Sequence, residues 1–164
     1  MKLGILSDSH DNVPLVELAV RRFQQEDLAM VIHAGDFIAP FAVAPLSALE
    51  CPVVAVLGNN DGEKIGLQRK FDGGIGQLHP QLADVEVEGR RIAAMHYPEM
   101  ADAIAPSGIY DLVIYGHTHQ VEIRPGASLV VNPGEVGGWV TGRSTIALVD
   151  LDDLSVESVD LHST

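Results

Sequence analysis

KLGILSDSHDN, at residues 2–12, joins a short apolar run directly to a group of polar side chains. The run Lys2–Ser7 has the length and composition of a strand buried on both faces, which is typical of parallel sheets. Asp8 and His10 follow at the point where this strand is expected to end. Beyond them an apolar helical face repeats at every third or fourth position, at Val16, Ala19, Val20 and Phe23. The stretch therefore predicts a strand, a polar loop and a helix.

Four more predicted strands end in polar residues in the same way. They are the apolar runs Ala29–His33, Val53–Leu57, Arg90–Met95 and Leu112–Tyr115. The polar residues that follow them are, in the same order, Gly35-Asp36, Gly58-Asn59-Asn60-Asp61, His96 and Gly116-His117-Thr118-His119. The carboxyl ends of parallel strands line one crevice of a sheet, so these separate segments are expected to deliver their polar groups to a single edge.

The remaining segments predict the organisation of the chain. Asp11 and Asn12 are predicted caps of the first helix, Pro14 is tolerated in its first turn, and a helix interrupted near Pro45 is predicted over residues 39–49. A hairpin around Glu88-Gly89 is predicted between Asp84–Val87 and Arg90–Met95, and further strands at Val121–Arg124, Ser128–Val131, Ser144–Asp150 and Val156–Leu161. This order predicts two sheets with helices on their outer faces, and residues 1–164 are expected to form one domain because no repeat or linker interrupts them.

The composition is that of a compact acidic domain. Apolar residues make up 46% of the 164 residues, and the formal net charge is −13. No basic cluster is evident, which disfavours broad binding to nucleic acids or anionic membranes. No apolar stretch reaches the ~18–20 residues that would span a bilayer, and the amino terminus lacks the features of a signal peptide. With Cys51 as its one cysteine the chain forms no internal disulfide, and we expect a cytoplasmic protein. The oligomeric state stays open, a homo-oligomer included.

The polar residues at the strand ends form a ligand set for metal ions. They are Asp8, His10, Asp36, Asn59, His96, His117 and His119. Carboxylate, imidazole and amide ligands without a thiolate suit Mn²⁺, Ni²⁺, Fe²⁺ or Zn²⁺ rather than a structural cysteine site. So many ligands suit two ions that share one carboxylate, for which Asp36 is the natural candidate. Glycines at positions 35, 58 and 116 allow the backbone to approach the ions closely.

Each of these segments also has a simpler interpretation. Asp8-Ser9-His10 alone is more often a loop with a helix cap, Gly35-Asp36 is usually a turn, and a lone His96 is often a satisfied core histidine. Their common position, each after its own strand, favours the metal site.

A few other polar residues are assigned by position. His33 is expected to support the site rather than bind metal, and His79 and His162 are expected on the surface. Arg143 is expected to pair with a substrate phosphate or with a buried carboxylate. The segment Asn132-Pro133-Gly134 predicts a turn.

The segments SDSHDN, HAGDF, GNND, the lone His96 and GHTH closely resemble the signature motifs of the calcineurin-like metallophosphoesterase superfamily. The likeness is greatest to its small bacterial and archaeal single-domain phosphodiesterases, and it extends from Asp8 to Arg143. It implies an α/β fold, a four-layer α-β-β-α sandwich of two mixed β-sheets flanked by helices, with two metals at the strand ends. It also implies one ion held by Asp8, His10 and His119, a second held by Asn59, His96 and His117, and a bridging Asp36.

Two positions depart from the family pattern. Many members have a histidine after the ligand asparagine, where it is thought to bind substrate and help protonate the leaving group. Here that residue is Asn60, which cannot donate a proton in this way. Glycine commonly follows the histidine at position 96, whereas here Tyr97 is expected to narrow the pocket. The residues expected to act in catalysis are Asn60, Asp36 and His117.

The resemblance and the charges together predict a hydrolase that cleaves small phosphodiesters by attack of a metal-activated hydroxide, with Mn²⁺ as the expected ion. A diester carries one negative charge and needs fewer cationic side chains than a monoester, which favours a phosphodiesterase over a phosphomonoesterase. The alternative from another class is a non-catalytic protein-binding scaffold on the same fold, like the small retromer subunit. The intact histidines argue against that scaffold, and a flavodoxin-like binding domain would leave them unexplained.

Overall fold

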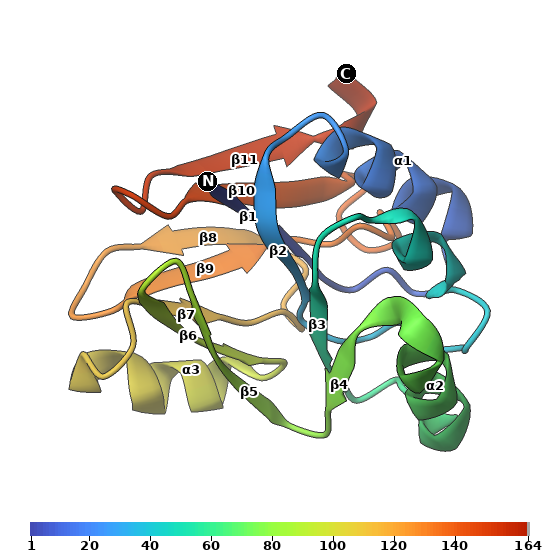
Figure 1. Cartoon of the computed structure of the whole chain (residues 1–164), viewed down its shortest axis with the longest axis horizontal. Coiled ribbons are helices and arrows are strands. Elements are labelled where there is room, and N and C mark those ends of the chain that lie inside the picture. Colours follow the sequence, from blue (N-terminus) through green and yellow to red (C-terminus); the bar gives the residue numbers. More distant parts are fainter. Residues whose placement is uncertain (164) are drawn as a thin grey trace.

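The computed structural model describes residues 1–163 and contains two mixed β-sheets (Figure 1). The strands of the first sheet are β1 (Lys2–Leu6), β2 (Leu28–His33), β3 (Val53–Val56), β4 (Gln77–His79), β10 (Thr145–Asp150) and β11 (Val156–Asp160). They lie in the order β11-β10-β1-β2-β3-β4. Strands β1 to β4 run parallel to one another, whereas β10 pairs antiparallel with both β1 and β11.

The second sheet also has a parallel centre. Its strands are β5 (Leu82–Val87), β6 (Arg90–Met95), β7 (Leu112–Ile114), β8 (Val121–Arg124) and β9 (Leu129–Pro133). They lie in the order β5-β6-β7-β9-β8, in which β6, β7 and β9 are parallel and the two edge strands are antiparallel to their neighbours. The predicted hairpin between residues 84 and 95 is therefore confirmed.

Helices cover the outer faces of both sheets, which gives four layers (Figure 1). The helices are α1 (Val13–Phe23), α2 (Lys64–Lys70) and α3 (Pro98–Ile104). One apolar core lies between the first sheet and the helices α1 and α2, a second lies between the two sheets, and a third lies between the second sheet and α3. The predicted sandwich of two mixed sheets flanked by helices is confirmed.

The alternation of residues along β1 explains how two of these cores share one strand. Leu3 and Ile5 point into the core between the sheets, and Leu6 packs in the core under α1. Gly4 faces α1, where an added Cβ atom would lie 2.8 Å from Cε1 of Phe23. Phe23 and the other apolar positions predicted for this helix are all buried.

Two local predictions were wrong. The expected helix over residues 39–49 is only a 3-10 turn at Ala44–Ala48, because Pro45 lacks an N–H donor and disfavours helical backbone at the residue before it. Asn12 stands at the helix start, but its side chain does not cap α1. Its amide instead donates to the carbonyl oxygen of Gly137, at 2.9 Å, and so ties the first loop to a distant one.

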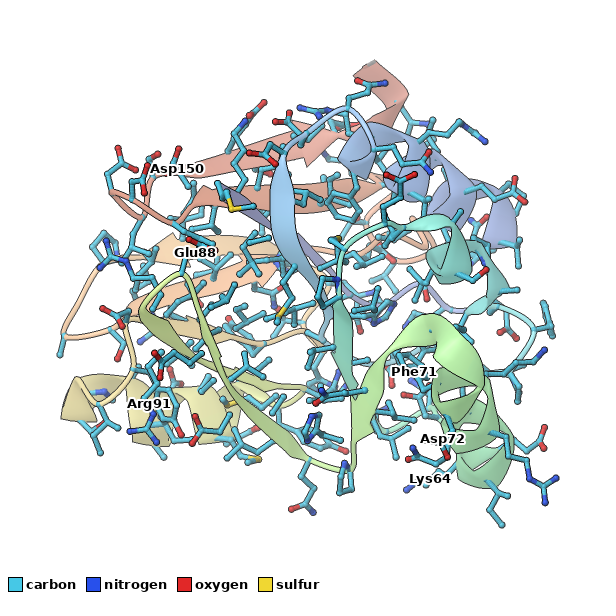
Figure 2. The ribbon with its side chains drawn as sticks, in the orientation of Figure 1. Lys64, Phe71, Asp72, Glu88, Arg91 and Asp150 are labelled. Atoms are coloured by element: carbon cyan, nitrogen blue, oxygen red, sulfur yellow. The ribbon has the colours of Figure 1, made fainter. Side chains whose placement is uncertain are left out.

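Three short elements were not predicted: α2, α3 and the edge strand β4. The helix α2 buries one side chain, Leu67, and is followed by a π-helical turn at Phe71–Ile75. Phe71 lies in the core beneath the helix, whereas Lys64 and Asp72 are exposed (Figure 2). His79, predicted on the surface, lies in β4 and is partly buried, with an enclosed Nε2 atom, while His162 is exposed as predicted. No helix within residues 1–163 combines the length and the apolar composition needed to cross a membrane.

We predict that Phe23→Ala lowers the free energy of unfolding by about 3–5 kcal/mol, because it leaves a cavity where α1 meets β1. The matched control is Ile65→Ala, which shortens a side chain that is 71% exposed. It should change the free energy of unfolding by no more than about 0.5 kcal/mol. Urea denaturation of both variants measures the difference, and equal midpoints would contradict the assigned packing.

Candidate metal centre

The structure brings all the predicted ligand residues together at one edge of the two sheets. Loops that follow β1, β2 and β3 supply Asp8, His10, Asp36 and Asn59, and loops that follow β6 and β7 supply His96, His117 and His119. Two groups of side chains within this set have the spacing of metal ligands. They are Asp8, His10 and His119, and Asp8, Asp36 and His96.

The first group surrounds the Oδ1 atom of Asp8. This atom lies 3.8 Å from Nε2 of His10 and 3.5 Å from Nε2 of His119, and the two imidazole rings stack with their centroids 5.0 Å apart. Asp8 is fully buried, and its other oxygen accepts hydrogen bonds from the Ser7 hydroxyl and the His117 backbone N–H. The Oδ1 atom itself is buried without a hydrogen-bond partner.

The second group consists of Asp8, Asp36 and His96, and the Asn59 side chain lies beside it. The Oδ2 atom of Asp36 lies 3.6 Å from Nε2 of His10 and 3.5 Å from Nε2 of His96, so it reaches both groups. The Oδ1 atom of Asn59 lies 3.0 Å from Nε2 of His96 and 2.9 Å from Nδ1 of His117. Asp36 therefore lies beside a histidine of each group, and Asp8 belongs to both groups.

The hydrogen bonds of the histidines suit the binding of cations. Nδ1 of His96 donates to the carbonyl oxygen of Ala34, at 2.8 Å, so in the neutral ring Nε2 carries only a lone pair. That lone pair faces the Asn59 oxygen, which is also an acceptor. In the first group, the Nδ1 atom of His119 bonds to Glu135, which leaves its Nε2 facing the orphaned Asp8 oxygen. Hydrogen-bond acceptors that face each other can share a cation between them, so these nitrogen and oxygen atoms fit divalent metal ions as ligands.

The two carboxylates are buried without a permanent cationic side chain beside them. Among the described residues, the ion-pair partners of Asp8 and Asp36 are histidines and never lysine or arginine. Burial raises the pKa of Asp36, but the neighbouring His96 and the hydrogen bonds from Asn60 outweigh it and hold the pKa well below its usual range. The Asp8 carboxylate raises the pKa of His10. Burial lowers the pKa of His96, but the nearby Asp36 more than compensates and raises it.

The backbone at the candidate ligands is strained. Positive φ angles of 43° to 68° occur at Asp8, His10, Asp36, His117 and His119. This left-handed region is uncommon for residues other than glycine and often marks a functional site. Two neighbouring glycines are needed for a different reason, since a Cβ atom on Gly58 would collide with Asp36 and one on Gly116 would collide with Ser7.

Buried polar side chains hold the strained loops in place. Asp61 accepts backbone N–H groups from Asp36, Ile38 and Gly58, and so joins the loops after β2 and β3. Asn132 donates to the carbonyl oxygen of Gly116 and to the Thr118 hydroxyl, which fixes the loop that carries His117 and His119. The turn predicted at residues 132–134 was wrong, because Asn132 and Pro133 are the last residues of β9, but Asn132 lies at the site and supports that loop.

His33 is buried and supports the loops that carry the candidate ligands, as its position predicted. Its Nδ1 atom accepts the Gly35 N–H, so its Nε2–H is the atom that donates to the Ser9 hydroxyl. Burial lowers its pKa to about 3, which keeps the ring neutral. Arg143, which was expected to pair with a substrate phosphate or a buried carboxylate, has a side chain that is 66% exposed. It pairs with the partly exposed Asp160 and not with a buried carboxylate. Arg143 and His119 also line one cavity of about 220 Å³.

Asn60, at the position where many family members have histidine, is bound to the central carboxylate. Its backbone N–H donates to Oδ1 of Asp36 at 2.8 Å, and its side-chain amide donates to Oδ2 at 2.7 Å. Asn60 therefore fixes the orientation of Asp36.

Glu135 is a site residue that the sequence analysis missed. It is fully buried and accepts hydrogen bonds from Nδ1 of His119, from the backbone N–H groups of residues 139–141 and from the Thr141 hydroxyl. Burial raises its pKa, but these bonds outweigh that effect and the pKa is lowered. A signal was present in the sequence, because Glu135 is the one charged residue between positions 125 and 142.

We predict that Glu135→Gln weakens the binding of divalent metal about 10- to 100-fold, which is typical when a carboxylate that orients a histidine ligand is lost. A glutamine would place an amide donor among groups that already donate. Titration of metal-depleted protein by calorimetry measures the effect, with the exposed Glu86→Gln as the control for lost charge. Equal weakening in both variants would assign the effect to net charge.

Comparison with known proteins agrees with this geometry. Residues 1–154 match the model of the calcineurin-like phosphoesterase superfamily domain. A phosphodiesterase of Methanocaldococcus jannaschii is 36% identical over 166 residues, which cover 99% of this chain and 100% of that protein. The solved structure of an archaeal phosphodiesterase has a TM-score of 0.91 at 34% identity and covers 98% of this chain and 99% of the other.

A more distant likeness concerns the fold alone. Vps29 of Entamoeba histolytica, solved in complex with zinc, has a TM-score of 0.70 at 20% identity and covers 98% of this chain and 99% of its own. The matched family model spans nearly the whole chain and the first relative is similar over its full length. This chain therefore belongs to the calcineurin-like phosphoesterase superfamily.

Proposed function

We propose that this chain, acting as one domain, is a phosphodiesterase that works with two divalent metal ions. One observation carries the proposal: two buried carboxylates and several histidine and amide side chains converge on one region. Among the described residues, no lysine or arginine forms an ion pair with either carboxylate. The M. jannaschii relative, which is named a phosphodiesterase, supports the same activity.

The proposed ligands divide into two sets. Asp8, His10 and His119 would hold one ion, Asn59, His96 and His117 would hold the other, and Asp36 would contact both. Metal ions of this kind supply Lewis-acid stabilisation of a phosphoryl group and lower the pKa of water. We propose Mn²⁺ as the native ion, because the ligands are oxygen and nitrogen atoms without a thiolate, although Ni²⁺, Fe²⁺ and Zn²⁺ fit the same donors.

The chain's own residues prepare the site for a small diester. Asn60 holds Asp36 through two hydrogen bonds, and Glu135 keeps the His119 ring turned towards Asp8. The ring centroid of Tyr97 lies 5.2 Å from those of His96 and His117, so Tyr97 limits the space for substrate beside these two histidines. The scarcity of cationic side chains favours the single charge of a diester. The lack of an internal disulfide supports a cytoplasmic location.

We predict that removing metal with a chelator reduces hydrolysis of bis(4-nitrophenyl) phosphate to the background rate, and that Mn²⁺ restores it. The monoester 4-nitrophenyl phosphate should be a poorer substrate under the same conditions. Release of nitrophenol, measured together with the metal content of each sample, checks both statements. Full turnover by thoroughly metal-free protein would refute the proposal. Bound metal with no hydrolysis of any ester would favour a protein-binding scaffold.

We predict that Asn60→His speeds the hydrolysis of diesters with poor leaving groups, because an imidazole can protonate the departing oxygen and an amide cannot. General acid catalysis is typically worth ~10²–10⁴-fold. A plot of log kcat/KM against the pKa of the leaving group should therefore be steep for the wild type and shallower for the variant.

Asn60→Ala is the matched control, because it removes the side-chain hydrogen bond to Asp36 without adding an acid. It should lower all rates and keep the steep slope. A shallow slope already present in the wild type would mean that another residue supplies the proton.

A further inference from the structure

Trp139 stands exposed at the rim of the candidate metal centre. It is the chain's one tryptophan, and 67% of its surface is exposed. Its indole Nε1–H donates to the carbonyl oxygen of His10 at 3.1 Å, and its backbone N–H donates to Glu135 at 3.0 Å. Glu135 in turn binds His119, so Trp139 is linked directly to His10 and through Glu135 to His119, two residues of the same proposed metal-binding set.

The local sequence lets the indole lie close against the backbone of the first loop. A Cβ atom on Gly137 would lie 2.9 Å from Cδ1 of Trp139 and 3.0 Å from the carbonyl oxygen of Asp8. Glycine at this position therefore lets the ring and the backbone of the first loop approach closely. Because the one polar atom of the indole is already bonded to His10, the part of the ring that remains exposed is apolar.

Most of the Trp139 residue is exposed, so part of its ring is open to a ligand. Within residues 1–163 the aromatic and cation contacts involve other rings, and none stacks on Trp139. A single exposed apolar residue needs no explanation by itself. An exposed indole bonded to the backbone of a proposed ligand does need one, because this bond and the backbone hydrogen bond from Trp139 to Glu135 keep the residue beside the centre.

We propose that Trp139 forms a stacking subsite for a planar aromatic group of the phosphodiester substrate, either a simple aryl group or a nucleobase. This inference rests on the proposed function and specifies its substrate class. Stacking suits this chain, because it binds an organic group without cationic side chains, of which the chain has 10 against 23 acidic ones. The contact is made equally in the bound substrate and in the transition state, so it should lower KM and leave kcat nearly unchanged.

The test uses phosphinates, whose P–C bonds resist hydrolysis, as probes of the metal-loaded protein. Diphenylphosphinate and diethylphosphinate carry the same charge, but only the first has planar rings. Because Trp139 is the one tryptophan, fluorescence excited at 295 nm reports on this ring alone. We expect diphenylphosphinate to change the emission and to bind about 10-fold more tightly than diethylphosphinate.

Variants separate stacking from support of His10. Trp139→Ala should raise the inhibition constant of diphenylphosphinate about 10-fold and leave that of diethylphosphinate unchanged. Trp139→Phe, which keeps a ring but loses the bond to His10, should retain most of the preference. The control Phe41→Ala removes another exposed ring, 59% exposed, and should change neither constant. Equal loss for both probes in Trp139→Ala would overturn the proposal and assign Trp139 a structural role.

Substrates complete the test and identify the source of the ring. With nitrophenol as a constant leaving group, the second ester group is varied from methyl to phenyl to a nucleoside. Trp139→Ala should raise KM for the phenyl and nucleoside esters only. The ester with the lower KM in the wild type, phenyl or nucleoside, identifies the kind of ring that the subsite prefers. Hydrolysis without any ring preference would reject the subsite but keep the phosphodiesterase. Ring-specific quenching without hydrolysis would keep the subsite and reject the phosphodiesterase.

Discussion

Two buried carboxylates, Asp8 and Asp36, impose the constraint on which the site depends. A buried charge is costly unless it is paired and hydrogen-bonded. Here neutral donors, such as the Ser7 hydroxyl and the N–H groups of His117 and Asn60, satisfy part of each carboxylate, and no lysine or arginine pairs with either among the described residues. We infer that the missing positive charge comes from bound metal, which explains why histidines rather than lysine or arginine lie beside both carboxylates.

The packing of the two sheets sets the distance between the halves of the site. The first sheet carries Asp8, His10, Asp36 and Asn59 on its loops, and the second carries the remaining histidines. The core between the sheets includes Leu3, Ile5 and Ile114. Its packing therefore sets the positions of the candidate ligands, although these core residues are not ligands themselves. Hydrogen bonds finish the alignment: Asp61 joins two loops of the first sheet, and Asn132 fixes the loop after β7.

The sequence predicted the parts of the molecule whose signals are local and strong. Long apolar runs located the main strands, and the polar residues at their ends were brought together as expected because parallel strands share a direction. The helix α2 was missed because a short segment that buries only Leu67 has no helical periodicity to detect. Glu135 was missed, and the role of Asp61 was not predicted, for another reason. Their partners are mainly backbone N–H groups of folded loops, which no pattern of side chains reveals.

The left-handed backbone at five of the candidate ligands has a consequence for protein engineering. Glycine would relieve the strain at any of these positions, and strain of this kind is worth on the order of 1–3 kcal/mol for each residue. Each such change would also delete a ligand, so selection for thermostability alone would favour variants that have lost the centre. A library intended to stabilise this protein should therefore keep these positions fixed and vary the exposed residues of α2, where no such conflict between stability and activity exists.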